Sequence, residues 1–128
     1  MTQEEFIEVL DKERYPYEIE GDNIVVTHEG DVNLESLKSL PPGVEFKNKG
    51  YVRLRDLKSL PPGVEFKNGW YVLLNSLTSI SPGVEFRNKG DVNLDALIGE
   101  WFDDWEGNIK GIDSNRLLNL MISKGMFI

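Results

Sequence analysis

The sequence contains no cysteine and a single histidine among its 128 residues. The lack of cysteine excludes disulfides, thiolate metal sites and cysteine nucleophiles, and His28 has no second histidine or cysteine to join in a metal site. No apolar run approaches the roughly 20 residues that a membrane-spanning helix needs. The opening stretch, MTQEEFIEVLDKERY, is acidic and amphipathic, unlike a secretory signal. We therefore expect a cytoplasmic protein that does not enter membranes and uses no cofactor.

Basic residues are also scarce, and the net charge of −8 is unevenly distributed. Residues 1–30 hold nine acids and two bases, residues 31–90 six acids and nine bases, and residues 91–128 seven acids and three bases. A nucleic-acid backbone selects a coherent basic surface. The acidic ends therefore argue against direct nucleic-acid binding.

The sequence is rich in an internal repeat. The decamers PPGVEFKNKG, PPGVEFKNGW and SPGVEFRNKG occupy residues 41–50, 61–70 and 81–90, and their columns continue at a strict spacing of 20. IVVTHEG is a degenerate earlier copy, with Ile24 and Val26 in the apolar columns. The columns hold Val32, Val52, Val72 and Val92; Leu34, Leu54, Leu74 and Leu94; Leu37, Leu57, Leu77 and Leu97; Leu40, Leu60 and Ile80; Val44, Val64 and Val84; and Phe46, Phe66 and Phe86.

Within a coil, apolar residues first alternate with polar ones, which is typical of strands, and then recur every three residues. Asparagine and glycine separate the two alternating stretches, and Pro-Pro-Gly follows the last leucine. This order predicts strand, bend, strand, tight helical turn and corner. One such unit cannot enclose a core, but stacked copies bury their columns continuously. We expect about four coils over residues 24–97.

The spacing and the recurring LxSLPPGVxFxN resemble a short, degenerate form of bacterial leucine-rich repeats. More closely, the chain is similar to small repeat proteins of bacterial and phage origin, which carry a tail like WFDDWEGNIKGIDSNRLLNLMISKG. The resemblance implies a solenoid and little chemistry. Because Asn48 follows Phe46 by two residues, where the leucine-rich pattern LxxLxLxxN has three, we expect a compact β-solenoid without regular outer helices.

The two ends are predicted to cap the stack. In residues 1–23, Thr2 and Glu5 form a capping box that opens an amphipathic helix, and a hairpin follows. In residues 98–128, Glu100 breaks the leucine column, and a final helix is expected from about Asp113 or Ser114 to Gly125. The expected buried face of that helix is Leu117, Leu118, Met121 and Ile122. The fold class is thus a single α+β domain, mainly β, built as a capped, leucine-rich-repeat-like parallel β-solenoid with terminal helices.

Three polar groups have a structural explanation that we favour over a functional one. His28 falls in the column of Asn48, Asn68 and Asn88 and is expected to end a ladder of side-chain amides. The acids of residues 100–106 alternate with aromatics, which is typical of a capping segment rather than of a metal or acid–base site. Glu45, Glu65 and Glu85 form a row beside Lys47, Lys67 and Arg87, which predicts a solvated, charge-paired face.

The outward positions of the second strand break the repeat. The middle coils carry aromatic and basic residues there, and Trp70 replaces a column glycine, whereas the first and last coils carry the polar and acidic residues Asp31, Asn33, Glu35 and Asp91, Asn93, Asp95. Aromatic residues and arginine framed by acids are enriched at protein-interface hot spots. The alternative is a simple cross-strand tyrosine pair with Trp70 covering a gap left by Gly69. The candidate binding residues are Tyr51, Arg53, Arg55, Trp70, Tyr71 and Leu73.

These observations predict a non-enzymatic repeat module, monomeric or weakly dimeric, that binds an unidentified protein through a flat face. An alternative is a phage or mobile-element inhibitor of a bacterial defence nuclease, of anti-CRISPR or anti-restriction type, that acts through its acidic surface. A third is an enzyme that uses the acids of residues 100–106. Salt separates the first two, since acidic mimicry weakens steeply with ionic strength.

Overall fold

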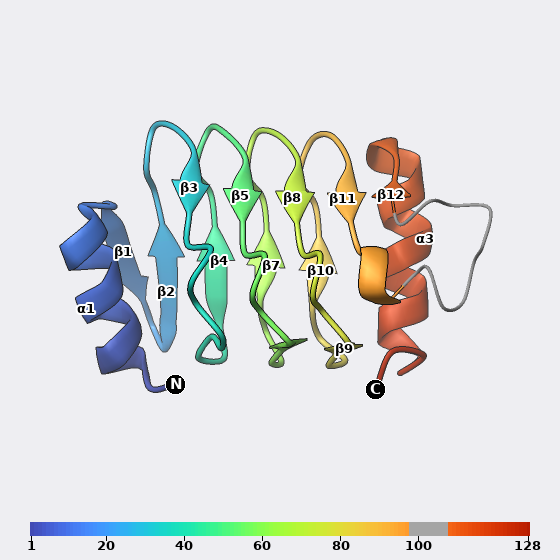
Figure 1. Ribbon diagram of the computed structural model, residues 1–128, viewed down its shortest axis with the longest axis horizontal. Coiled ribbons are helices and arrows are strands. Elements are labelled where there is room, and N and C mark those ends of the chain that lie inside the picture. The colour runs from blue at the N-terminus through green and yellow to red at the C-terminus, as the bar shows by residue number, and fades with distance from the viewer. Residues whose placement is uncertain (98–107) are drawn as a thin grey trace.

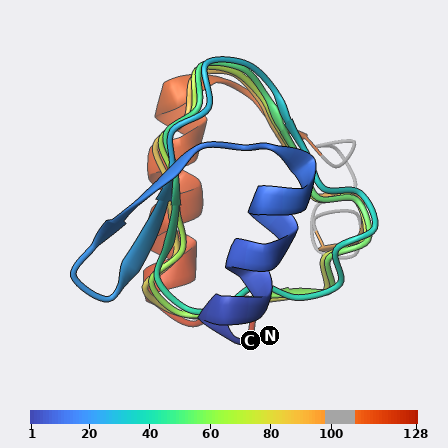
Figure 2. The same cartoon turned by 90° about the vertical axis from the view of Figure 1, so that its left-hand side faces the viewer.

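The computed structural model describes residues 1–97 and 108–128. It shows coils stacked side by side between two terminal helices (Figure 1). Viewed along the stack, the coils superimpose on one another (Figure 2). The predicted mainly β solenoid of about four coils is confirmed. The elements are α1 (Gln3–Glu13), β1 (Tyr17–Glu20), β2 (Asn23–Val26), β3 (Val32–Asn33), β4 (Val44–Phe46), β5 (Val52–Arg53), β6 (Ser59–Leu60), β7 (Glu65–Phe66), β8 (Val72–Leu73), β9 (Ser79–Ile80), β10 (Glu85–Phe86), β11 (Val92–Asn93), β12 (Asn108–Ile109) and α3 (Gly111–Ser123).

The coils contribute to three sheets. The first sheet has the order β1-β2-β4-β7-β10, the second β12-β11-β8-β5-β3, and the third contains β6 and β9. Successive coils pair in parallel with a register of twenty residues, so that Val52 lies opposite Val72 and Glu45 opposite Glu65. The register follows from the uninterrupted repeat. Among the strands that the structure describes, only β1 and β12 pair antiparallel with their neighbours.

The inward columns form one continuous core. Phe46, Phe66 and Phe86 are fully buried or nearly so, and their rings stack with centroids 5.2 and 4.9 Å apart. The valine and leucine columns of the same coils are equally buried. The stacked, nearly parallel rings give each coil the same inner surface, and the next coil packs against this surface.

The bend between the two main strands is held by a buried asparagine in each coil. Asn48 Nδ2 donates to the carbonyl of Gly30 in the preceding coil, at 3.0 Å, and to the carbonyl of Tyr51 in its own, at 2.9 Å. The expected amide ladder is therefore a set of bonds from amides to backbone carbonyls. The His28 ring lies against the Tyr15 ring, with centroids 5.0 Å apart.

The helical turn predicted after Leu54 is shorter than expected. Leu57 N donates to Leu54 O, which closes a single three-residue turn. The chain then extends, and β6 pairs in parallel with β9. The three-residue leucine spacing thus marks one turn followed by a short strand, whereas the sequence predicted a tight helical turn that leads directly into the corner.

The terminal helices follow the prediction in part. Thr2 and Glu5 form the capping box of α1, whereas α3 begins at Gly111, earlier than predicted. Leu118, Met121 and Ile122 of α3 are buried, but Leu117 is exposed, which corrects the predicted face. At 3.6 residues per turn, Met121 and Ile122 lie on either side of Leu118, and Leu117 lies about 40° beyond Met121, outside the buried stripe. The predictions for Glu100 and the acids of residues 100–106 lie outside the described residues.

Side chains and backbone from the two ends close the strand edges. Tyr15 Oη accepts a hydrogen bond of 3.0 Å from the Asn33 amide of β3. The Asn119 carboxamide bonds both the amide and the carbonyl of Phe86 in β10, at 2.6 and 3.0 Å. The carbonyl of Phe127 accepts from the Ile80 amide of β9. The caps therefore occupy the positions that a further coil would take.

Among the described helices, none has the length and apolar character needed to cross a bilayer.

Candidate functional site

The second sheet brings the six predicted binding residues together on its outer face. Val52 and Val72 point into the core, so their strand neighbours point outward. The coils are numbered along the chain: coil one holds β2 and β3, coil two β4 to β6, coil three β7 to β9, and coil four β10 and β11. β5 and β8 lie side by side in register, which places the outward residues of coils two and three next to each other. The six residues, here called the aromatic face, are Tyr51, Arg53, Arg55, Trp70, Tyr71 and Leu73.

Two tyrosines and an arginine form the centre of the aromatic face. The Tyr51 and Tyr71 rings stack at 4.9 Å with an angle of 14° between their planes. The Arg53 guanidinium carbon lies 4.5 Å from the centroid of the Tyr51 ring, and its Nη2 donates to the Tyr71 hydroxyl at 3.0 Å. This hydrogen bond raises the pKa of Arg53, whose guanidinium is always charged. The cation and the two rings form one ordered unit.

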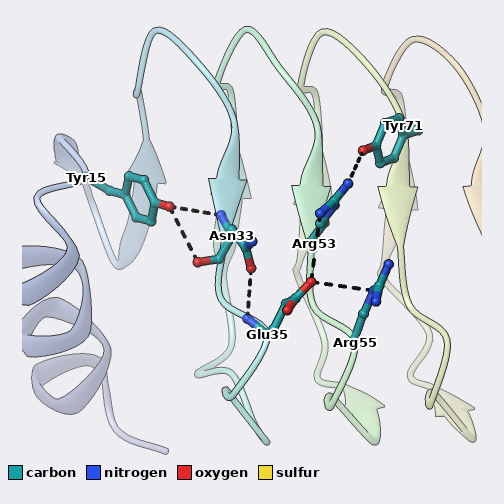
Figure 3. Close-up of polar contacts among 6 residues, drawn as sticks. All are labelled: Tyr15, Asn33, Glu35, Arg53, Arg55 and Tyr71. Carbon is teal, nitrogen blue, oxygen red and sulfur yellow. Dashed lines mark hydrogen bonds and ion pairs between the residues drawn. The ribbon is translucent and has the colours of Figure 1, made fainter.

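Glu35 neutralises the arginines from the neighbouring coil. Its Oε1 lies 3.5 Å from Arg55 Nε and 4.0 Å from Arg53 Nη1. The Asn33 side chain accepts from the Glu35 amide, and the Asn33 backbone bonds Tyr15, so polar contacts run from the N-terminal cap to Tyr71 (Figure 3). The sequence analysis placed Glu35 only among the framing acids. The signal for its pairing is the column that it shares with Arg55.

Trp70 is the most exposed aromatic side chain described, with 56% of its surface accessible. A Cβ at position 69 would overlap the Lys49 carbonyl, so this coil needs its glycine there and position 70 is open to a side chain. The Trp70 ring meets the Tyr71 ring edge-on at 5.0 Å, and it lies beside Gly90. Trp70 therefore leans toward the fourth coil and stands on the surface.

A hollow of about 340 Å³ opens beside Trp70, between coils three and four. It is lined by Trp70, Tyr71, Val72 and Leu73 of one coil and by Gly90, Asp91 and Asn93 of the next. Within residues 1–97 and 108–128, no base forms an ion pair with Asp91 or Asp95. This half of the second sheet therefore differs from the half around Glu35, where the acid is paired. The sequence analysis did not single out Asp91 and Asn93 as site residues.

The outer face of the first sheet is charge-paired, as predicted. Lys67 Nζ lies 3.0 Å from Glu45 and 2.9 Å from Glu65, and Arg87 pairs with Glu85 at 2.7 Å. Glu45 is only 8% exposed, so the prediction of a fully solvated row is wrong at this position. Burial raises the pKa of Glu45, but the neighbouring Glu65 carboxyl and the Lys67 ammonium lower it, and the net shift is downward. Lys67 has a raised pKa because of its two carboxylate partners.

Acidic and histidine side chains of the described residues do not gather into a group of three that could hold a metal ion. The candidate site on the described surface is therefore the aromatic face together with the hollow beside it. Comparisons of the chain with protein-family models, with known proteins by sequence and with solved structures find no match.

Proposed function

We propose that this chain is a non-enzymatic binding module that engages another protein through the aromatic face and the adjacent hollow. The observation that carries the proposal is the exposure of Trp70 beside an ordered aromatic pair. Exposed tryptophan and tyrosine next to arginine are the residues that dominate the binding energy of protein interfaces.

The arrangement is suited to a rigid partner contact. Tyr51, Tyr71 and Arg53 hold one another in place, and parallel strands of the solenoid hold their backbones. Side chains that are already ordered lose little conformational entropy on binding, which increases affinity. The variable columns lie on the second sheet, whereas the first sheet neutralises its own charges. Binding is therefore expected on the second sheet.

Affinity capture from the organism that encodes the chain tests the proposal. The immobilised proteins are the wild type, Trp70→Gly, which restores the consensus glycine, and Lys47→Ala, which changes the first sheet. A protein retained by the wild type and by Lys47→Ala should be lost from Trp70→Gly. Loss of a hot-spot contact weakens binding by about 2 kcal/mol or more, which is about thirtyfold.

The folded state of each variant is checked by thermal unfolding before capture. If a specific partner is retained equally by wild type and Trp70→Gly, binding does not use the aromatic face and the proposal is wrong. The acidic-inhibitor alternative predicts instead that retention falls steeply with salt and is indifferent to Trp70. Washes at low and high ionic strength separate the two, because aromatic contacts are only weakly screened.

A further inference from the structure

The contacts of Arg53 in coil two show how an arginine side chain is held on this sheet. In coil two, Arg53 places its guanidinium 4.5 Å from the Tyr51 ring centroid. The same group reaches the residue eighteen positions later, the Tyr71 hydroxyl, at 3.0 Å (Figure 3). Coil two therefore supplies both the ring and the cation, and coil three supplies the hydrogen-bond acceptor.

In the next coil, the aromatic ring is kept but the arginine is replaced by leucine. Tyr71 takes the place of Tyr51, and Leu73 takes the place of Arg53. The residue eighteen positions after Leu73 is Asp91, a carboxylate where the previous coil has a phenol. The hollow lies at this point, lined by Tyr71, Leu73 and Asp91 and walled by Trp70.

We propose that the hollow between Trp70 and Asp91 binds an arginine side chain of the partner protein. The guanidinium lies against the Tyr71 and Trp70 rings, as that of Arg53 lies over Tyr51, and donates to the Asp91 carboxylate. The proposal rests on the proposed function, since it names the group that the aromatic face recognises.

The chemistry of the hollow selects this group over others. A planar guanidinium stacks on aromatic rings and bonds a carboxylate through two parallel donors. Among the described residues, Asp91 and Asp95 have no cation of their own, and residues 91–128 carry seven acids against three bases. An acidic or phosphorylated partner group would be repelled, and a neutral apolar one would leave Asp91 desolvated without a counter-charge.

A titration with a short peptide tests the inference without the partner. The probe is N-acetyl-Gly-Arg-Gly-amide, and the control is the same peptide with citrulline, which has the shape of arginine without its charge. The indole N–H resonance of Trp70, assigned by its loss in Trp70→Gly, reports binding. We expect a saturable shift with the arginine peptide and a much smaller one with the citrulline peptide. Equal shifts with both, or no shift with either, would overturn the inference.

Two matched variants test whether the guanidinium of the peptide binds next to Asp91. Asp91→Asn should weaken binding of the arginine peptide by about threefold to fivefold, as expected for a partly exposed ion pair. Asp31→Asn removes the same charge from the same column at the other end of the face and should leave binding unchanged. An equal effect of the two substitutions would mean that only net charge attracts the peptide.

Leu73→Arg gives an independent test, because it rebuilds within the chain the arrangement of coil two. Its own guanidinium should fill the hollow and abolish the shift caused by the peptide, whereas Leu73→Met should keep it. Binding that is unaffected by Leu73→Arg would place the arginine elsewhere.

Partner capture separates this inference from the proposed function. If Trp70→Gly loses the partner and Asp91→Asn retains it at full strength, the face binds a protein but not through an arginine in the hollow. If both variants retain the partner, the proposed function fails as well.

Discussion

Deleting residues 51–70 should leave a folded, shorter solenoid. The deletion removes β5, β6 and β7 and joins Gly50 to Tyr71, which preserves the repeat sequence across the junction. β4 can then pair with β10 and β3 with β8, because their residues already share one register of twenty. The residues that the caps bond, Asn33, Phe86 and Ile80, all lie outside the deleted segment and are kept. The core therefore remains continuous with one layer fewer.

The cost follows from the size of the lost coil. Stability of about 0.05–0.15 kcal/mol per residue gives about 1–3 kcal/mol for a coil of twenty residues. The urea m-value, which scales with the surface exposed on unfolding, should fall by about one sixth. Far-ultraviolet circular dichroism during urea unfolding measures both quantities.

A shorter deletion provides the control. Removing residues 51–60 takes out half a period, so that β-strands of one coil would face corners of the next, and this variant should not fold. If the half-period deletion unfolds with the same midpoint as the full-period deletion, stacking in register does not hold this protein together. Complete unfolding of the full-period variant would equally contradict the inference that neighbouring coils make equivalent contacts.

Four further predictions concern single residues. Phe66→Ala should cost about 3–5 kcal/mol in urea unfolding, because its ring is fully buried between two others. Glu65→Ala should cost no more than about 1 kcal/mol, since it removes only a partly exposed ion pair. Asn119→Ala should cost about 1–3 kcal/mol and promote concentration-dependent association in sedimentation, because it uncovers a strand edge, whereas Ser123→Ala should not. The lowered pKa of Glu45 contributes stability that is fully present above its ordinary value of 4.5 and is lost as the pH falls through the lower folded-state value. Melting temperatures of the wild type should therefore drop more between pH 5 and pH 3 than those of Glu45→Gln; equal slopes would contradict this.

The solenoid could be predicted because the repeat over-determines it. A strict period of twenty leaves one register, and the two-residue alternation assigns each column to the core or to the surface. The third sheet was missed because a three-residue spacing fits both a helical turn and a turn followed by an extended pair. Leu60 and Ile80 pair through backbone groups that leave no mark on the side-chain pattern.

The caps were predicted as helices, but their chemistry was not. Asn119 supplies a carboxamide to Phe86, and such a contact depends on how a helix from residues 111–123 is placed against a strand thirty-three residues earlier. Leu117 was assigned to the wrong face because the helix of the last segment has apolar residues on adjacent positions, and periodicity alone cannot choose between them.

The candidate face was located from the columns that break the repeat, and its members do lie together. The hollow was not predicted. It lies where Leu73 takes the place of Arg53, beside the Tyr71 ring and with Asp91 where the previous coil has a tyrosine. The sequence shows that leucine replaces arginine between coils two and three. It does not show that Arg53 contacts Tyr71, and without that contact the replacement does not indicate a site.

The closed edges bear on how this chain can bind another protein. A parallel sheet usually offers its edge strands to a partner strand. Here Tyr15 covers β3, Asn119 covers β10 and the carbonyl of Phe127 meets β9. The outer edge of β1 carries Glu18 and Glu20, and charged edge strands resist pairing. Strand addition is therefore disfavoured at these four strand edges, which favours recognition by side chains on a lateral face, where the aromatic face and Asp91 lie.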